Sequence, residues 1–207
     1  FGDHLSTPGL ELLTGAQPTA TAAELQSIAE AVRTSARHWT AGATRQPMTE
    51  SHSSVLARPL CAKFVQHLES AHQDSHSSRH DFQLEILPSE LAALIGDSPA
   101  RSLHQLFGER VDVIKMRRVQ AKGQCINFHI DHAARTMQVP LNPEEDYKGG
   151  RLLWITERGL VQPPRPAGSA SIHTQGIVHG VSTMREGIRF GLFFLQYAPP
   201  EGGSEAA

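Results

Sequence analysis

The chain has 207 residues and a formal net charge of −2. This length suits a single domain with a substantial core, and the near-neutral charge argues against a dedicated binder of nucleic acids or acidic membranes. The two cysteines, Cys61 and Cys125, exclude a disulfide framework and a CxxC metal site. No apolar run reaches transmembrane length and no signal-peptide pattern opens the sequence, so we expect an intracellular protein.

The first 110 residues carry mainly helical patterns. Residues 1–20 are rich in Gly, Pro and Thr and predict an extended lead-in. Thr21 and Glu24 have the spacing of a capping box, which predicts a helix that begins at Thr21. A second helix is predicted to begin near Pro59, because proline suits the first turn of a helix.

Polar loops and a strand are predicted around these helices. Residues 40–54 and 72–80 are polar and predict loops, while "DFQLEIL" at 81–87 alternates as a strand does. "PSELAALIG" at 88–96 opens with Pro and closes with Gly, which predicts a short helix. We therefore expect residues 1–110 to form a helical support region within the same domain as the rest of the chain.

From residue 111 the pattern becomes strand-like, with Gly, Pro, Asn or Asp in most of the gaps. No helical pattern intervenes, which favours a jelly roll or barrel over a parallel α/β sheet. We expect a mainly β protein with N-terminal helices, a β core over 111–197 and a disordered tail over 198–207. The predicted strands are 111–118, 124–130, 136–142, 150–155, 159–163, 168–173, 177–181 and 188–196.

The segment "CINFHID" at 125–131 ends in a histidine and an aspartate two residues apart. Residues i and i+2 of a strand project from the same face, so His129 and Asp131 can aim at one point. A second such pair, His72 and Asp74, lies at a predicted helix end or loop, and helical residues two apart diverge by about 200°. Only the first pair is therefore a candidate for binding a metal ion.

A 2-His-1-carboxylate metal centre, as in ferrous oxygenases, needs one more histidine. The downstream candidates are His132, His173 and His179. His179 lies in the apolar run "GIVHGV", which we interpret as forming a hairpin with "IRFGLFFLQ", centred near Met184. In that register Arg189 faces His179 and points into the same cavity. A guanidinium there suits a carboxylate, as a dicarboxylate co-substrate would require.

The stretch from about 111 to 196 resembles the prolyl-4-hydroxylase-type branch of the Fe(II)/2-oxoglutarate-dependent oxygenases. The matching motifs are "HID" at 129–131, "DYKGGRLLWI" at 146–155, "PAGSASI" at 166–172, "HGV" at 179–181 and "GIR" at 187–189. The resemblance implies a double-stranded β-helix core, with His129, Asp131 and His179 as catalytic iron ligands. It also implies that Arg189 anchors 2-oxoglutarate.

The same resemblance implies the reaction: an Fe(II)-, 2-oxoglutarate- and O2-dependent hydroxylation of an unactivated C–H bond. A side chain of a protein or peptide, prolyl being the commonest case, is the expected substrate. Two alternatives stay open. One is a small-molecule oxygenase, and the other is a non-catalytic β-barrel binding module of the same fold. Asp131 is intact, which argues against a halogenase.

The chain departs from this family where tyrosines commonly help to hold 2-oxoglutarate. No tyrosine occurs in "RRVQAKGQ" before the His-x-Asp pair or in "TMQVPLN" after it. Gln120, Gln124, Thr136 or Gln138 could supply the missing hydrogen bonds. The absence of the tyrosines is the feature that favours a binding module without catalysis.

Other residues have a structural interpretation that we prefer. We expect His132 at the surface, His173 as a hydrogen-bonded structural histidine, and Trp154 in the core. Arg117 and Arg118 are expected at a solvated strand edge, and the runs "SHSS" and "PPRP" allow the loops to bind a partner. Four histidines look like a second metal cluster, but a solvated loop explains them as well: His67, His72, His76 and His80.

Overall fold

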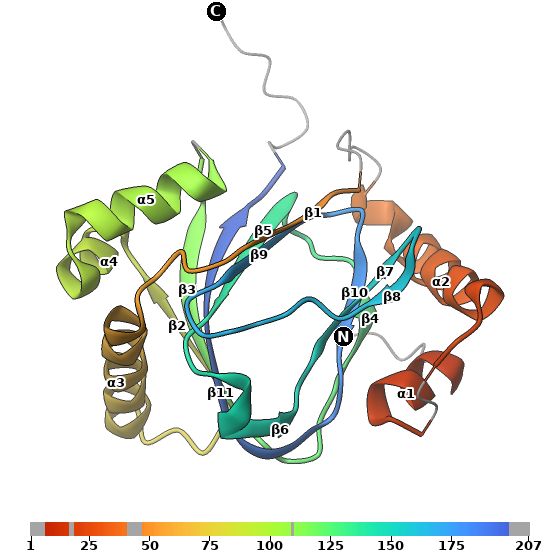
Figure 1. Ribbon diagram of the computed structural model, residues 1–207, viewed down its shortest axis with the longest axis horizontal. Coiled ribbons are helices and arrows are strands. Elements are labelled where there is room, and N and C mark those ends of the chain that lie inside the picture. Colours follow the sequence, from red (N-terminus) through yellow and green to blue (C-terminus); the bar gives the residue numbers. More distant parts are fainter. Residues whose placement is uncertain (1–6, 17–18, 41–46, 109, 199–207) are drawn as a thin grey trace, which may run out of the picture.

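Two antiparallel sheets face each other, and helices cover the outer face of each (Figure 1). The computed structural model describes residues 7–16, 19–40, 47–108 and 110–198. This arrangement of facing sheets confirms the expected jelly-roll class, a mainly β core supported by N-terminal helices.

The larger sheet has its strands in the order β1-β9-β5-β11-β3-β2, and β6 pairs with the first residues of β11. All of these pairs are antiparallel, with Arg189 of β11 opposite Val119 of β3. The strands are β1 (Thr49–His52), β2 (Asp81–Ile86), β3 (Val113–Gln120), β5 (Arg135–Pro140), β6 (Tyr147–Gly149), β9 (Ala170–Thr174) and β11 (Met184–Gln196).

The smaller sheet has the order β4-β10-β7-β8 and is also antiparallel. Its strands are β4 (Ile126–His129), β7 (Leu152–Thr156), β8 (Gly159–Val161) and β10 (Val178–Val181). A short 3-10 helix, η1 (Glu144–Asp146), precedes β6. Every strand predicted from residue 111 onward is present, since the alternation of apolar and polar residues specifies which face each strand buries.

Three helices pack on the outer face of the larger sheet: α3 (Arg58–Asp74), α4 (Pro88–Ile95) and α5 (Asp97–Phe107). The outward residues of β11, Phe190, Leu192 and Phe194, are buried against them. Because side chains alternate along a strand, Arg189 and its neighbours at i+2 and i+4 point instead into the space between the sheets. The helix layer thus fixes which side chains face the interior.

Two more helices, α1 (Thr7–Thr14) and α2 (Ala22–Thr40), cover the smaller sheet. The capping box of α2 is confirmed, because the Thr21 backbone N–H donates to Glu24 Oε2 at 2.7 Å and the Glu24 N–H donates to Thr21 Oγ1 at 3.3 Å. None of the helices in the described ranges is both long and apolar enough to cross a bilayer. The tail predicted to be disordered lies, from residue 199 on, outside the described residues.

The N-terminal predictions were wrong in two places. Residues 7–14 form α1 rather than an extended lead-in, because Leu12 and Leu13 are buried against the smaller sheet and α2. Residues 49–52, predicted as loop, form β1 by pairing with the edge of β9. An edge strand gains its backbone hydrogen bonds whatever its side chains, so its sequence need not alternate. The region before residue 111 therefore contributes strands β1 and β2 as well as helices.

The predicted hairpin between His179 and Arg189 does not form. Strand β10 pairs with β4 and β7 in the smaller sheet, whereas β11 pairs with β3, β5 and β6. The chain passes from one sheet to the other between Val181 and Met184. The two residues therefore lie in different sheets rather than side by side in one.

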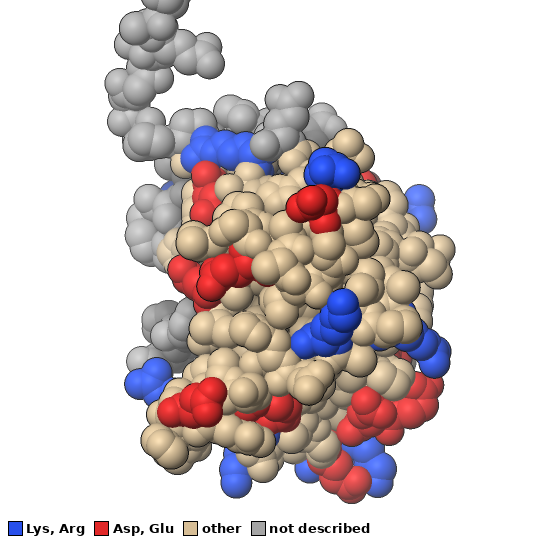
Figure 2. All heavy atoms as spheres, turned by 90° about the vertical axis from the view of Figure 1, so that its left-hand side faces the viewer, with Lys and Arg blue, Asp and Glu red and all other residues tan. Residues whose placement is uncertain are grey.

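Figure 2 shows the face that α3, α4 and α5 cover. Acidic and basic side chains are interspersed on this face, and neither sign gathers into a continuous patch. This distribution offers no electrostatic footprint for nucleic acid on that face.

Candidate metal centre

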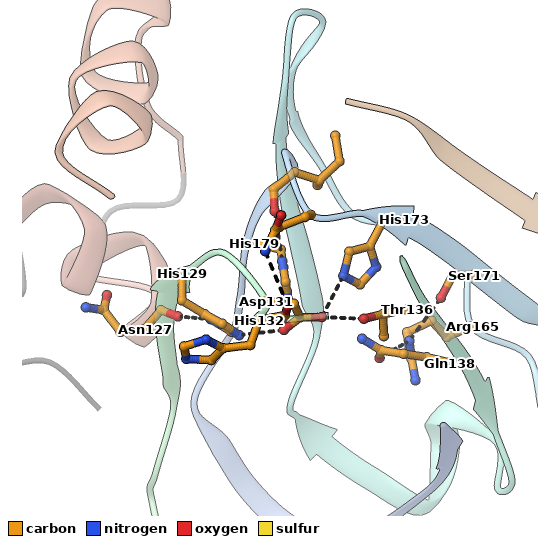
Figure 3. Close-up of polar contacts among 12 residues, drawn as sticks. Asn127, His129, Asp131, His132, Thr136, Gln138, Arg165, Ser171, His173 and His179 are labelled. Atoms are coloured by element: carbon orange, nitrogen blue, oxygen red, sulfur yellow. Dashed lines mark hydrogen bonds and ion pairs between the residues drawn. The ribbon is translucent and has the colours of Figure 1, made fainter. Parts of the chain in front are cut away.

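The three metal ligands predicted from the sequence, His129, Asp131 and His179, come together at the inner face of the smaller sheet. His129 ends β4, Asp131 follows it, and His179 lies in β10 directly opposite His129 (Figure 3). Opposed residues of an antiparallel pair share a sheet face, which brings the two imidazoles together. The ligand atoms of all three residues lie within 4.8 Å of one another, as a metal ion requires.

Hydrogen bonds to backbone carbonyls orient both imidazoles. Nδ1 of His129 is 2.7 Å from the carbonyl of Asn127, and Nδ1 of His179 is 3.0 Å from that of Ile177. Because a carbonyl can only accept, both Nδ1 atoms donate to it, and both Nε2 atoms are left to face the centre. Each Nε2 lies 3.5 Å from the same oxygen, Oδ1 of Asp131.

This arrangement fits a divalent cation. Two imidazole nitrogens and a carboxylate oxygen converge on one point, and these are ligand types that a divalent transition metal takes in proteins. Two histidines and one carboxylate on one side of an ion leave its other positions open for further ligands. Among the described parts of the chain, these residues are the one group that could hold a metal ion, so no second cluster forms from His67, His72, His76 and His80.

The outer oxygen of Asp131 is held by two donors. Oδ2 accepts from Thr136 Oγ1 at 2.6 Å and from His173 Nε2 at 3.1 Å. Burial acts to raise the pKa of Asp131, but its interactions with the three histidines outweigh burial and place the pKa well below its ordinary value. The carboxylate is therefore ionised, and Oδ1 is the oxygen left to bind a metal.

The centre is open on one side. The side chains of His129 and Asp131 are 30% and 23% exposed, whereas that of His179 is 4% exposed. A ligand can therefore reach the centre past His129 and Asp131, while His179 forms its buried wall.

A cavity lies between the two sheets. Val181, two residues beyond His179 on the same face, lies in its wall with Ile126, and Gly191 and Phe193 form the opposite wall. A Cβ at Gly191 would stand 3.0 Å from the Phe193 ring, so glycine there keeps the cavity wider. Arg189 also lines the cavity.

Arg189 is buried, and its Nη1 donates to the carbonyl of Gly150 at 2.8 Å. Burial, followed by the charge of Arg165, lowers the pKa of Arg189 to about 9. Gly149 and Gly150 both have positive φ, +78° and +63°. The Gly-Gly turn thus positions the carbonyl that orients the guanidinium.

No family model and no curated protein matches the sequence. Solved structures do match the fold. The viral collagen prolyl hydroxylase vCPH from Paramecium Bursaria Chlorella virus-1, in complex with 2OG, superposes with a TM-score of 0.53 at 15% identity, covering 73% of this chain and 96% of that one. HygX from Streptomyces hygroscopicus, with nickel and 2-oxoglutarate bound, gives a TM-score of 0.57 at 10% identity over 72% of this chain and 82% of its own.

A prolyl hydroxylase from Trichoplax adhaerens, in complex with a peptide fragment of hypoxia inducible factor, gives a TM-score of 0.53 at 14% identity, covering 86% of this chain and 94% of that one. The fold is that of the 2-oxoglutarate- and Fe(II)-dependent oxygenases. At these identities the likeness concerns the oxygenase fold alone.

Within the oxygenase fold, the four proposed substitutes for the missing tyrosines have different places. Thr136 binds Asp131, and Gln138 accepts a hydrogen bond from Arg165 at 3.1 Å. Gln124 reaches the cavity wall, but its amide group is bound to the backbone of Lys122 and Gln120. Gln120 is exposed and lies opposite Ile188 of the helix-covered face, so it points away from the cavity.

Arg165 was not among the predicted site residues. It is 2% exposed and donates from Nη1 to Gln138 Oε1 and Ser171 Oγ. It lies in "PPRP", a composition typical of an exposed loop, and no local pattern signals that this loop turns inward.

The predictions for the tryptophan and for His132 are confirmed, whereas those for the two arginines of β3 are wrong. Trp154 is buried as predicted, with its ring centroid 6.2 Å from that of His173, and His132 is exposed. Arg117 and Arg118 do not form a solvated edge. Arg117 lies in the cavity wall and pairs with Asp81, while Arg118 is 6% exposed and pairs with Glu69 of the covering helix α3.

Proposed function

We propose that this protein is an Fe(II)- and 2-oxoglutarate-dependent oxygenase that hydroxylates an unactivated C–H bond. The observation that carries the proposal is the convergence of three metal-ligand atoms, Nε2 of His129, Nε2 of His179 and Oδ1 of Asp131. Hydrogen bonds on the far side of each group hold it in that orientation before any metal arrives.

Arg189 supports 2-oxoglutarate as the co-substrate. Its guanidinium lines the cavity between the sheets, whose wall also includes Val181, two residues beyond His179, so it can pair with the distal carboxylate of a molecule whose other end reaches the metal. Fe(II), when bound, supplies the oxygen chemistry. In the overall reaction 2-oxoglutarate and O2 become succinate and carbon dioxide, and the substrate gains a hydroxyl group.

A protein or peptide side chain, prolyl being the first to test, is the proposed substrate. The partial exposure of His129 and Asp131 supports it, because an open centre can admit a chain segment that a closed pocket would exclude. The similar fold of a prolyl hydroxylase bound to a peptide supports the same choice. A small-molecule substrate is the competing outcome of the test.

The first experiment is an anaerobic absorption titration. We expect a visible metal-to-ligand charge-transfer band only when both Fe(II) and 2-oxoglutarate are added to the metal-free protein. Absence of the band in folded protein would overturn the oxygenase assignment and favour a binding module. Succinate release in the presence of proline-containing peptides, compared with the same peptides carrying alanine, then tests the substrate class.

A further inference from the structure

Arg165 is the largest of the fully buried side chains in the described ranges, and its guanidinium has no carboxylate partner among the described residues. Nη1 donates to Gln138 and Ser171, at 3.1 Å and 3.4 Å. Nε and Nη2 have no hydrogen-bond partner among the described residues. A buried charged group in this state is costly, because it has lost water without gaining a full set of acceptors.

The two unpartnered nitrogens form a specific shape. Nε–H and one N–H of Nη2 point in parallel from the same edge of a planar guanidinium, which is the edge that binds the two oxygens of a carboxylate. The two neutral acceptors on Nη1 fix the plane and leave this edge unoccupied. The side chain is therefore oriented to receive a carboxylate.

The charges around Arg165 leave a positive excess. Arg189 is close enough for the charge of Arg165 to lower its pKa. Tyr147, which also makes a side-chain hydrogen bond with Arg165, and Glu144 act to raise its pKa against the effect of burial, but Glu144 is already paired with Arg151. Two guanidiniums thus share the interior with no carboxylate of their own, a situation that an anionic ligand would relieve.

Polar side chains of β5 connect the region of Arg165 with the metal centre. Figure 3 shows a row of polar side chains that runs from Asp131 through Thr136 to Gln138 and Arg165. Thr136 and Gln138 are two residues apart on the same face of β5, a rise of about 7 Å. Arg165 therefore stands one step beyond the residue that touches the metal ligand, which is where the far end of a short dicarboxylate would lie.

We propose that Arg165 and Arg189 together hold the distal carboxylate of the 2-oxo acid, and that Arg165 makes the site selective for a dicarboxylate. This inference rests on the proposed function. It assigns to a loop arginine the hydrogen bonds that neither of the expected tyrosine neighbourhoods supplies. A monocarboxylate such as pyruvate would leave both guanidiniums unpaired and would gain nothing from Arg165.

The test compares 2-oxoglutarate with pyruvate in the Fe(II)-loaded, anaerobic protein, with the charge-transfer band as the readout. We expect Arg165→Met to raise the dissociation constant of 2-oxoglutarate at least tenfold and to leave that of pyruvate within twofold of the wild type. Arg165→Lys keeps the charge but cannot donate two parallel hydrogen bonds to a carboxylate. Its dissociation constant for 2-oxoglutarate should therefore lie between those of the wild type and Arg165→Met. Arg101→Met, a change at an exposed arginine of α5, is the matched control and should alter neither constant.

A second readout needs neither metal nor co-substrate. Because Arg165→Met removes an unpaired buried charge, we expect the ligand-free variant to unfold at a higher temperature than the wild type. A structural role for Arg165 predicts the opposite, a lower unfolding temperature.

The outcomes separate the two hypotheses. If wild-type protein shows no band with 2-oxoglutarate, the proposed function fails and this inference fails with it. If the wild type shows the band and Arg165→Met binds 2-oxoglutarate equally well, the inference alone fails. Equal losses for 2-oxoglutarate and pyruvate would also overturn it, because they would mean that Arg165 acts through the metal centre or the fold.

Discussion

His173 donates a hydrogen bond from Nε2 to Oδ2 of Asp131 at 3.1 Å, although the two residues are 42 positions apart in sequence. Thr136 donates to the same oxygen, and the opposite oxygen of the carboxylate faces the two other histidines. The two donors therefore decide which oxygen of Asp131 is offered to a metal, and His173 is a positioning residue of the centre.

Removing either donor should weaken metal binding. We expect His173→Phe and Thr136→Val each to reduce Fe(II) affinity by about 10- to 100-fold, because partners of metal ligands have effects of this size. Anaerobic Fe(II) titration of the metal-free proteins measures it. His67→Phe, at an exposed position of α3, is the control and should bind as the wild type does. Unchanged affinity in both donor variants would refute the positioning role.

Asp131→Ala should abolish metal binding and turnover while the fold persists. Its control is Asp74→Ala, in the other His-x-Asp pair. Asp74 ends helix α3, and His72 packs edge-on against Phe82 at a centroid distance of 5.1 Å, so these two residues do not share a target. Metal titration and circular dichroism of both variants make the comparison. Normal turnover in Asp131→Ala would remove the ligand assignment.

The Gly-Gly turn gives a stability prediction. Gly149 has a φ of +78°, and a Cβ there would clash with the carbonyl oxygen of Thr183. Gly123 has a similar φ of +75° with open space around it, so it isolates the effect of backbone conformation. We expect Gly123→Ala to cost about 1 kcal/mol of unfolding free energy. Gly149→Ala should cost roughly 3 kcal/mol or more, measured by urea denaturation. Equal losses would mean that the clash is relieved by movement of the turn.

The pair of Asp81 and Arg117 predicts a pH dependence of stability. Arg117 donates to both carboxylate oxygens of Asp81, at 2.8 Å and 2.6 Å. Burial acts to raise the pKa of Asp81, but Arg117 outweighs it and the pKa is lower than the ordinary value of 3.8. A carboxyl whose pKa is lower in the folded state stabilises the fold above its unfolded pKa and loses that effect as the pH falls through its folded pKa.

We therefore expect Asp81→Asn to lose about 1 kcal/mol of stability at pH 7, a typical value for such a pair. The difference from the wild type should shrink as the pH is lowered from 4 through the folded pKa of Asp81. Urea denaturation at several pH values tests this, with the exposed Asp74→Asn as the control. A difference that stays constant with pH would show that the charge of Asp81 contributes nothing.

Features that depend on residues close together in the sequence could be predicted, whereas features that depend on distant residues could not. The strand pattern and the His129–Asp131 pair depend on neighbours two residues apart, so both were accessible without a fold. The hairpin error arose because Val181 and Met184 are close in sequence yet belong to different sheets, and no local pattern marks that crossing. Arg165 was missed for the same reason. Burial of a charged loop residue depends on which distant strands surround it, here those that carry Gln138 and Ser171.

The place of Trp154 gives the protein an optical reporter of its own centre. This residue pairs directly with His179 across β7 and β10, and its indole is buried beside His173. Indole fluorescence is quenched by transition-metal ions at such short range. The chain has one other tryptophan, Trp39, so a Trp39→Phe variant would leave Trp154 as the single emitter. Loading of the centre, and exchange of one metal for another, should then be visible as changes in its emission.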